Sequence, residues 1–165
     1  MADIQIQVEA AHVDMTGAAL MAYANRYQDA ATKYLSVRAS TLGFDPVPYY
    51  LLCQSLELHL KSYIWLVDRI GAKTIKKKYG HRLKDLWIDA KARGIGRYAR
   101  ATDQRDRVIG LVSPYYARRQ LNYLDLEMLF RGYPALAAEP AVIPVLKRLT
   151  TQLGRTLHGQ ILGAG

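Results

Sequence analysis

Histidine is the side chain best suited to acid–base chemistry and metal binding near neutral pH, and the chain contains four of them: His12, His59, His81 and His158. A helical metal site often places two histidines one turn apart, as in His-x-x-x-His, and none of the four has such a partner. The single cysteine, Cys53, rules out a zinc site built on several thiolates. The sequence therefore gives no support for a metal or another cofactor.

Of the four histidines, His81 is the best candidate for a functional role, because it lies among several basic residues. It directly follows Gly80 and lies in a run of basic side chains, namely Lys76, Lys77, Lys78 and Arg82. Cations grouped with an imidazole can bind a phosphate, and the imidazole can also donate or accept a proton there. The competing interpretation is that His81 caps or packs a turn and contacts no ligand.

A second group of candidate binding residues lies further along the chain, where Arg118, Arg119 and Tyr123 fall in a segment rich in tyrosine and arginine. Guanidinium groups beside an aromatic ring can contact a phosphate and stack against a base. An equally good interpretation is that the two arginines pair with Asp125 or Glu127 and fix a turn.

The charge of the chain is concentrated in its middle. The net charge is +9, and residues 69–107, which we call the basic zone, contain thirteen Lys or Arg against four Asp or Glu. Arg97 and Arg100 belong to it, within and after a glycine-rich loop that lacks the Gly-Lys-Ser/Thr ending of a P-loop. A localised basic zone is the electrostatic footprint of a polyanion. A solvated face that aids solubility, or a surface for an acidic protein, would have the same composition.

These side chains depend on helices for their positions. Residues 49–67 contain neither Gly nor Pro and repeat apolar residues at three- and four-residue steps, which predicts a largely buried helix. Glu57 and Lys61 lie four residues apart in it, in the order that favours an ion pair along one face. The pair is interpreted either as an ion pair at the edge of the core or as a polar feature of a groove or dimer seam. Gly80 predicts a helix stop, with a new helix over 81–93.

Three further helices are expected. Residues 15–42 form the first, with a stripe that includes Tyr23 and Tyr27 packed against the helix over 49–67. Residues 102–113 form another, with Thr102 or Asp103 as its cap and Pro114 breaking or kinking it. The last spans residues 139–162, with its regular part from about Ile143.

The chain as a whole is expected to form one domain over 15–162, preceded by a mobile segment over 1–14. No stretch is long and apolar enough to cross a membrane, and the N-terminus lacks the features of a signal peptide. We therefore expect a cytoplasmic protein, in which Cys53 is a small core residue.

Within residues 44–92 the chain resembles the HEPN superfamily of small helical domains. The resemblance lies in a Glu-Leu-x-Leu-Lys core on a long helix and in Gly-His-x-Leu-x-x-Leu at the start of the next. The matching residues are Glu57, Leu58, Leu60, Lys61, Gly80, His81, Leu83 and Leu86. The resemblance implies an all-α fold, an antiparallel bundle of four to five main helices, a homodimer and a link to nucleotides and RNA.

The ribonuclease members of this superfamily carry an Arg, four to six further residues and then a His on a late helix. No histidine of this chain is preceded by an Arg at that spacing. The resemblance therefore implies a non-catalytic module that binds RNA or a nucleotide through the basic zone. Two alternatives stay open: a ribonuclease or toxin-like enzyme with a degenerate site at His81 or at the Arg155–His158 pair, and a protein-interaction module with an acidic partner.

Overall fold

The computed structural model describes residues 16–37, 44–122 and 132–162, and in these ranges the fold is all-α, as expected. Seven α-helices and one short 3₁₀ helix, η1, make up the described part of the chain. Their bounds are α1 Gly17–Val37, α2 Val47–Asp68, α3 Ala72–Tyr79, α4 Leu83–Ala92, η1 Ile95–Arg97, α5 Asp103–Ala117, α7 Pro134–Ala137 and α8 Val142–Leu162. The predicted mobile segment 1–14 lies outside the described residues, and so do residues 124–131, for which the sequence allows one or two helical turns.

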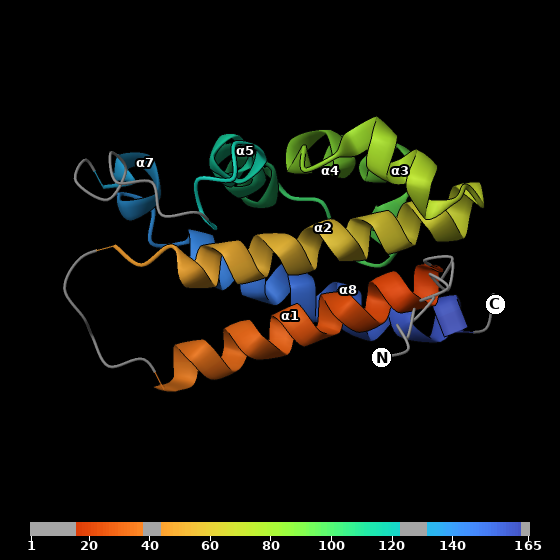
Figure 1. Cartoon of the computed structure of the whole chain (residues 1–165), viewed down its shortest axis with the longest axis horizontal. Helices are drawn as coiled ribbons and strands as arrows, with labels where there is room; N and C mark the ends of the chain where they lie inside the picture. The colour runs from red at the N-terminus through yellow and green to blue at the C-terminus, as the bar shows by residue number, and fades with distance from the viewer. Residues whose placement is uncertain (1–15, 38–43, 123–131, 163–165) are drawn as a thin grey trace, which may run out of the picture.

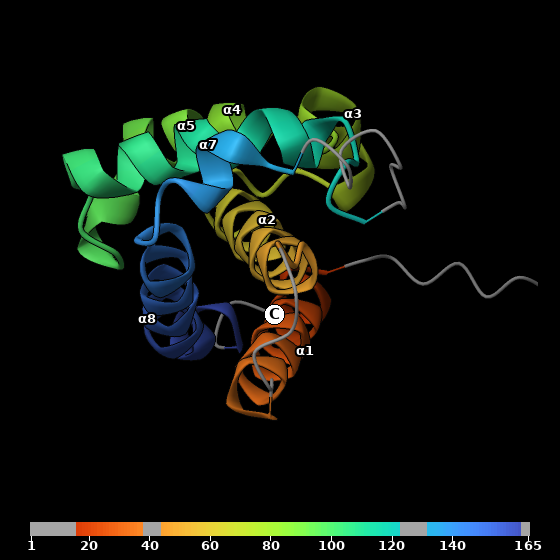
Figure 2. The ribbon, with the colours of Figure 1, turned by 90° about the vertical axis from the view of Figure 1, so that its left-hand side faces the viewer.

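Helix α2 is the centre of the structure. It packs against α1 and α8 on one side and against α3, α4 and α5 on the other (Figures 1 and 2). Every residue from 55 to 64 is buried, because neighbouring helices cover all faces of this stretch. The prediction of a largely buried helix over 49–67 is confirmed.

The helices form two layers around α2 and not a simple antiparallel bundle. Helix α1 runs antiparallel to α2, whereas α8 runs in the same direction as α2 (Figure 1). Helix α5 lies across α2 on its other side, beside α4 (Figures 1 and 2). None of the described helices combines the length and the apolar composition needed to span a bilayer.

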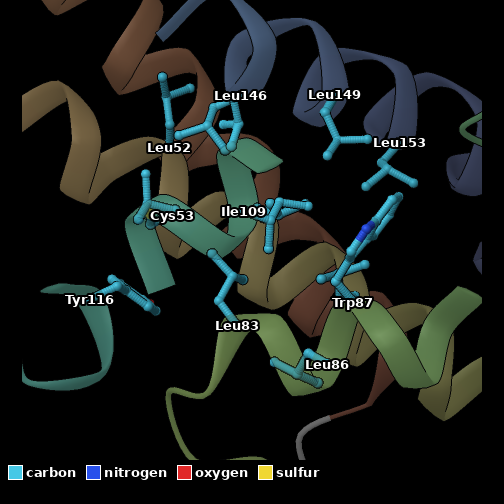
Figure 3. Close-up of a cluster of buried hydrophobic side chains, with 14 of the residues drawn as sticks. Leu52, Cys53, Leu83, Leu86, Trp87, Ile109, Tyr116, Leu146, Leu149 and Leu153 are labelled. Atoms are coloured by element: carbon cyan, nitrogen blue, oxygen red, sulfur yellow. The ribbon is translucent and has the colours of Figure 1, made fainter. Parts of the chain in front are cut away.

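The main hydrophobic core fills the space between α2, α4, α5 and α8 (Figure 3). Its fully buried members include Leu83 and Leu86 from α4, Ile109 from α5 and Leu149 from α8. Cys53 is completely buried among them, which confirms its prediction as a small core residue. Burial also raises the pKa of the Cys53 thiol well above its ordinary range, so this thiol stays protonated and unreactive.

Several expected helix boundaries differ from the structure. Pro114 does not end α5, which continues to Ala117, because the buried side chain of Tyr116 holds the last turn in place. Thr102 caps this helix, as one of the two predicted candidates, by accepting a hydrogen bond from the Arg105 amide at 3.3 Å. Helix α2 ends at Asp68, one residue beyond the predicted 49–67, and its C-cap Arg69 adopts the left-handed conformation.

Two details of the helix surfaces also differ. Helix α4 begins at Leu83 and not at 81, so His81 lies in the turn that precedes it. Tyr23, which the sequence places on the buried stripe of the first helix, is half exposed. Met21 and Ala24 are buried in its place. The face of α1 that packs against α2 is therefore rotated away from Tyr23.

A close approach at the start of α1 gives a first testable prediction. A Cβ atom on Gly17 would lie 2.2 Å from Trp65 Cε3 of α2, closer than two carbon atoms can approach. We expect Gly17→Ala to lower the free energy of unfolding by about 1–3 kcal/mol through overpacking. Gly110, in the interior of α5, has open space around it, and we expect Gly110→Ala to raise stability by about 0.5–1 kcal/mol. Urea unfolding followed by circular dichroism measures both, and equal stability of the two variants would contradict the prediction.

Candidate functional site

A buried carboxylate, Glu57, is the centre of the candidate site. Its side chain is 2% exposed and contacts three polar groups. Lys61 Nζ lies 2.5 Å from Oε1, His81 Nδ1 lies 2.9 Å from Oε2, and the Tyr116 hydroxyl donates to Oε2 at 2.6 Å. We call these four residues the Glu57 network. An ionised carboxylate only accepts hydrogen bonds, so His81 presents Nδ1–H to it.

Three helices bring the network together. Glu57 and Lys61 lie one turn apart on α2, and Lys61 Nζ also donates to the Gly80 carbonyl at 2.8 Å. Gly80 has a φ of +55°, a conformation that favours glycine, and it reverses the chain between α3 and α4 so that His81 contacts Glu57. Tyr116 reaches the same carboxylate from the last turn of α5. The predicted Glu57–Lys61 ion pair is therefore present, with the side chains of Lys61 and Glu57 9% and 2% exposed.

Tyr116 is held as a hydrogen-bond donor. Burial, and then the negative charge of Glu57, raise the pKa of its phenol far above the ordinary value. The phenol therefore stays protonated, and its oxygen also lies 2.5 Å from Oε1 of Gln54. The ring of His81 stands edge-on to the Tyr116 ring, with 5.8 Å between centroids. These contacts fix the orientation of His81 from two sides.

The end of α5 places Arg119 beside this network. The amide of Arg119 bonds to the Tyr116 carbonyl and the amide of Gln120 bonds to the Tyr115 carbonyl, each at 3.0 Å. This is the Schellman pattern of helix termination, in which the residue at the Arg119 position adopts a left-handed conformation and is most often glycine. Arg119 indeed has a φ of +60°. An arginine in this conformation costs about 1 kcal/mol or more compared with glycine.

A pocket of about 230 Å³ opens at the surface above the Glu57 network. We call it the His81 pocket, and its lining residues are Tyr50, Gln54, His81, Tyr116, Arg119 and Asn122. Since His81 Nδ1 is bound to Glu57, Nε2 is the ring nitrogen left for a ligand in the pocket. The pocket thus combines an imidazole, a guanidinium, two side-chain amides and two tyrosine rings, a set suited to bind an anion and to contact a planar ring.

The structure separates the predicted binding residues into groups. His81 and Arg119 line the pocket, whereas Arg118 is exposed next to Arg119 and outside the lining. Arg97 and Arg100 lie elsewhere, beside α8, because Thr156 of α8 bonds to the carbonyl of Tyr98 between them. Tyr123, with the carboxylates once expected to pair with the two arginines, lies outside the described residues.

Many cations of the basic zone have carboxylate partners. Lys76 and Lys77 are exposed on the last turn of α3, but Lys78 lies 3.0 Å from Asp89 and Arg82 lies 3.4 Å from Asp85. Lys91 also pairs with Asp106 inside the zone, and two further pairs, Arg93–Asp68 and Arg107–Glu139, join the zone to the rest of the chain. The excess positive charge counted along the sequence is therefore not one continuous patch.

The other histidines have different surroundings. His59 is completely buried, with Nδ1 2.9 Å from the Ser55 carbonyl and Nε2 3.1 Å from the side-chain amide of Asn25. The Arg155–His158 pair is exposed on α8, outside the His81 pocket. In the described ranges, no three His, Cys, Asp or Glu side chains come together as metal ligands would.

Sequence reasoning missed four residues of the pocket. Tyr50 and Gln54 lie on the same face of α2 as Glu57 and Lys61, at steps of four, three and four residues, so helical spacing could have identified them. Tyr116 and Asn122 could not be found in this way, because α5 was expected to stop before Tyr116. Their place depends on how α5 crosses α2.

Comparison with known proteins identifies no relative of this chain. A scan against protein-family models, a search of curated proteins and a search of solved structures each found no match for the chain. Any function assigned to this chain therefore depends on the chemistry of its own side chains.

Proposed function

We propose that this chain is a HEPN-like module that binds RNA or a nucleotide, with the His81 pocket as the contact point. The observation that carries the proposal is the pairing of His81 and Arg119 at one concave site above a buried carboxylate. Arginine binds phosphate oxygens through two parallel N–H groups, and His81 Nε2 adds a further hydrogen bond. The Glu57 network holds the imidazole ready for this contact.

The remaining lining residues fit a nucleotide as well. Tyr50 adds an aromatic ring to the pocket lining, and the amides of Gln54 and Asn122 can donate to and accept from the edge of a base. A volume of about 230 Å³ is below the roughly 300–1,000 Å³ typical of pockets that enclose a whole ligand. The pocket therefore takes one part of a nucleotide, while the rest of an RNA chain follows the exposed lysines at the end of α3.

A specific observation also favours the alternative of phosphodiester cleavage. A histidine that lines a pocket, with Nδ1 held by a buried carboxylate and Nε2 not engaged by it, has the arrangement of a general acid or base. Arg119 would stabilise the negative charge that develops on the phosphate. This reading predicts that His81→Gln abolishes cleavage and leaves RNA binding largely intact.

The binding proposal predicts a selective effect of Arg119→Gly. Glycine removes the guanidinium and relieves the left-handed backbone, so we expect the variant to be at least as stable as the natural chain. Its affinity for a labelled single-stranded oligoribonucleotide should fall about tenfold or more, and the slope of log affinity against log salt should decrease by about one. Arg69→Gly is a matched control, because Arg69 is the other arginine at positive φ, about 18 Å along α2 from Glu57. It should change the affinity less than about threefold.

The assay is a salt titration read on native and denaturing gels. Shifted, intact RNA with affinity that falls steeply as salt rises supports the binding module. Displacement of the RNA by an unlabelled mononucleotide would show that the pocket accepts a single nucleotide. Shortened RNA would favour cleavage at His81. Neither a shift nor cleavage at low salt would overturn both readings and leave an acidic protein as the partner of the basic surface.

A further inference from the structure

A second concave surface lies on the outward side of α8. Its volume is about 380 Å³, and we call it the α8 groove, lined by Lys147, Arg148, Thr151, Gln152, Arg155 and Thr156. Helix α8 contains no acidic residue at all, so its outward side carries only positive charge. None of the lining residues belongs to the His81 pocket, and α8 lies on the other side of α2 from α3 and α4 (Figure 2).

Arg105 of α5 extends this positive surface. Its guanidinium donates to Gln152 Oε1 at 2.8 Å and to the Arg100 carbonyl at 2.5 Å, which holds it against α8. Burial, together with the positive charge of Arg148, lowers the pKa of Arg105 below its ordinary value. Two cations therefore lie close enough to repel each other while one of them is partly removed from water.

No carboxylate in the described part of the chain pairs with Arg105, Lys147, Arg148 or Arg155. The cations of α3 and α4 differ in this respect, because several of them have an acidic partner. Like charges held together without a counter-charge are unfavourable, and a bound anion would remove the repulsion. Thr151 adds a hydrogen-bond donor. Its hydroxyl oxygen accepts a hydrogen bond from the Gln28 side chain at 2.8 Å, and the hydroxyl proton can still be donated to an anion.

The spacing of the cations indicates the shape of the anion. Arg148 and Arg155 are two turns apart on α8, about 10 Å along its axis, with Lys147 beside the first and Thr151 between them. An anion that extends along the helix can contact both arginines and the Thr151 hydroxyl between them, which favours a chain of phosphates over a single small anion. We propose that the α8 groove binds a chain of phosphate groups, independently of the His81 pocket.

The test compares two double variants of equal charge change. Arg148→Gln with Arg155→Gln removes the two groove arginines, and Arg26→Gln with Lys33→Gln removes two exposed cations of α1. Calorimetric titration with inorganic tripolyphosphate should show at least a tenfold loss of affinity for the groove variant and less than about threefold for the α1 variant. Arg119→Gly leaves the groove intact, so the tripolyphosphate binding that the groove variant loses should remain in Arg119→Gly, and failure of the groove and failure of the His81 pocket are distinguishable.

Titration with a labelled single-stranded oligoribonucleotide identifies the source of the phosphates. A parallel loss of RNA affinity in the groove variant supports a nucleic-acid phosphodiester chain. Loss of tripolyphosphate affinity alone supports a free polyphosphate-bearing ligand. Equal losses in the groove and α1 variants would overturn the proposal, because they would show a general charge effect. The absence of tripolyphosphate and RNA binding by the natural chain at low salt would overturn it as well.

Discussion

Replacing Glu57 with leucine is expected to lower the free energy of unfolding by about 3–5 kcal/mol. The change leaves the ammonium of Lys61 in a nearly buried position with only the Gly80 carbonyl as a partner, and it removes the acceptor of the His81 and Tyr116 hydrogen bonds. A buried charge without its counter-charge accounts for the size of the effect. Since a domain of this size is stable by about 5–15 kcal/mol, urea unfolding should show a large shift of the midpoint.

Two controls separate the buried pair from ion pairs in general. The exposed pair of Arg82 and Asp85 contributes little, so Asp85→Asn should change stability by less than about 1 kcal/mol. The double variant Glu57→Leu with Lys61→Leu removes both buried charges and should recover at least half of the loss. A single Glu57→Leu variant as stable as Asp85→Asn would show that the Glu57 network does not hold α2, α4 and α5 together.

Stability and ligand binding are coupled at this site, so a loss of binding in a variant has to be separated from a loss of stability. The carboxylate that stabilises the fold also orients His81, so a Glu57 variant changes both properties at once. Arg119 differs, because its side chain lines the pocket while its backbone conformation favours glycine. Arg119→Gly therefore tests ligand binding without the loss of stability that obscures Glu57→Leu.

Local sequence patterns predicted the parts of this structure that depend on neighbouring residues. The apolar spacing of 49–67 identified α2, and the four-residue step from Glu57 to Lys61 identified their ion pair. The cap at Thr102 was also among the predicted alternatives. Each of these features is decided within one or two helical turns, where periodicity and capping rules apply.

Features that depend on the packing of distant segments could not be predicted. Tyr116 joins Glu57 across 59 positions of the chain, and its burial is what keeps α5 helical beyond Pro114. The basic zone is a second example, because a count of charges over 69–107 does not show that Asp68 and Glu139, from outside it, neutralise part of it. The α8 groove lies entirely outside that zone, and only the packing of α5 against α8 places Arg105 beside it.

His59 gives the second large prediction, which concerns pH. Burial lowers the pKa of His59 from an ordinary value of 6.5 to about 4. Between pH 4 and pH 6.5, His59 binds a proton in the unfolded chain but not in the folded chain. The stability contributed by the neutral ring is therefore fully present above pH 6.5 and is lost as the pH falls towards 4. At 1.36 kcal/mol for each pH unit, the loss amounts to about 3 kcal/mol.

The comparison of natural chain and His59→Gln isolates this effect, because every other titrating group is common to both proteins. We expect the free energy of unfolding of the natural chain to fall about 3 kcal/mol further than that of the variant between pH 7 and pH 4. Ring signals of His59 in NMR spectra should stay those of a neutral imidazole at pH 5.5, because Ser55 and Asn25 hold the ring in a site closed to water. Parallel stability curves for the two proteins, or a ring that titrates near pH 6.5, would mean that water reaches His59 between α1 and α2. The seam between these two helices would then be open in solution, and the stability lost in Gly17→Ala should be small for the same reason.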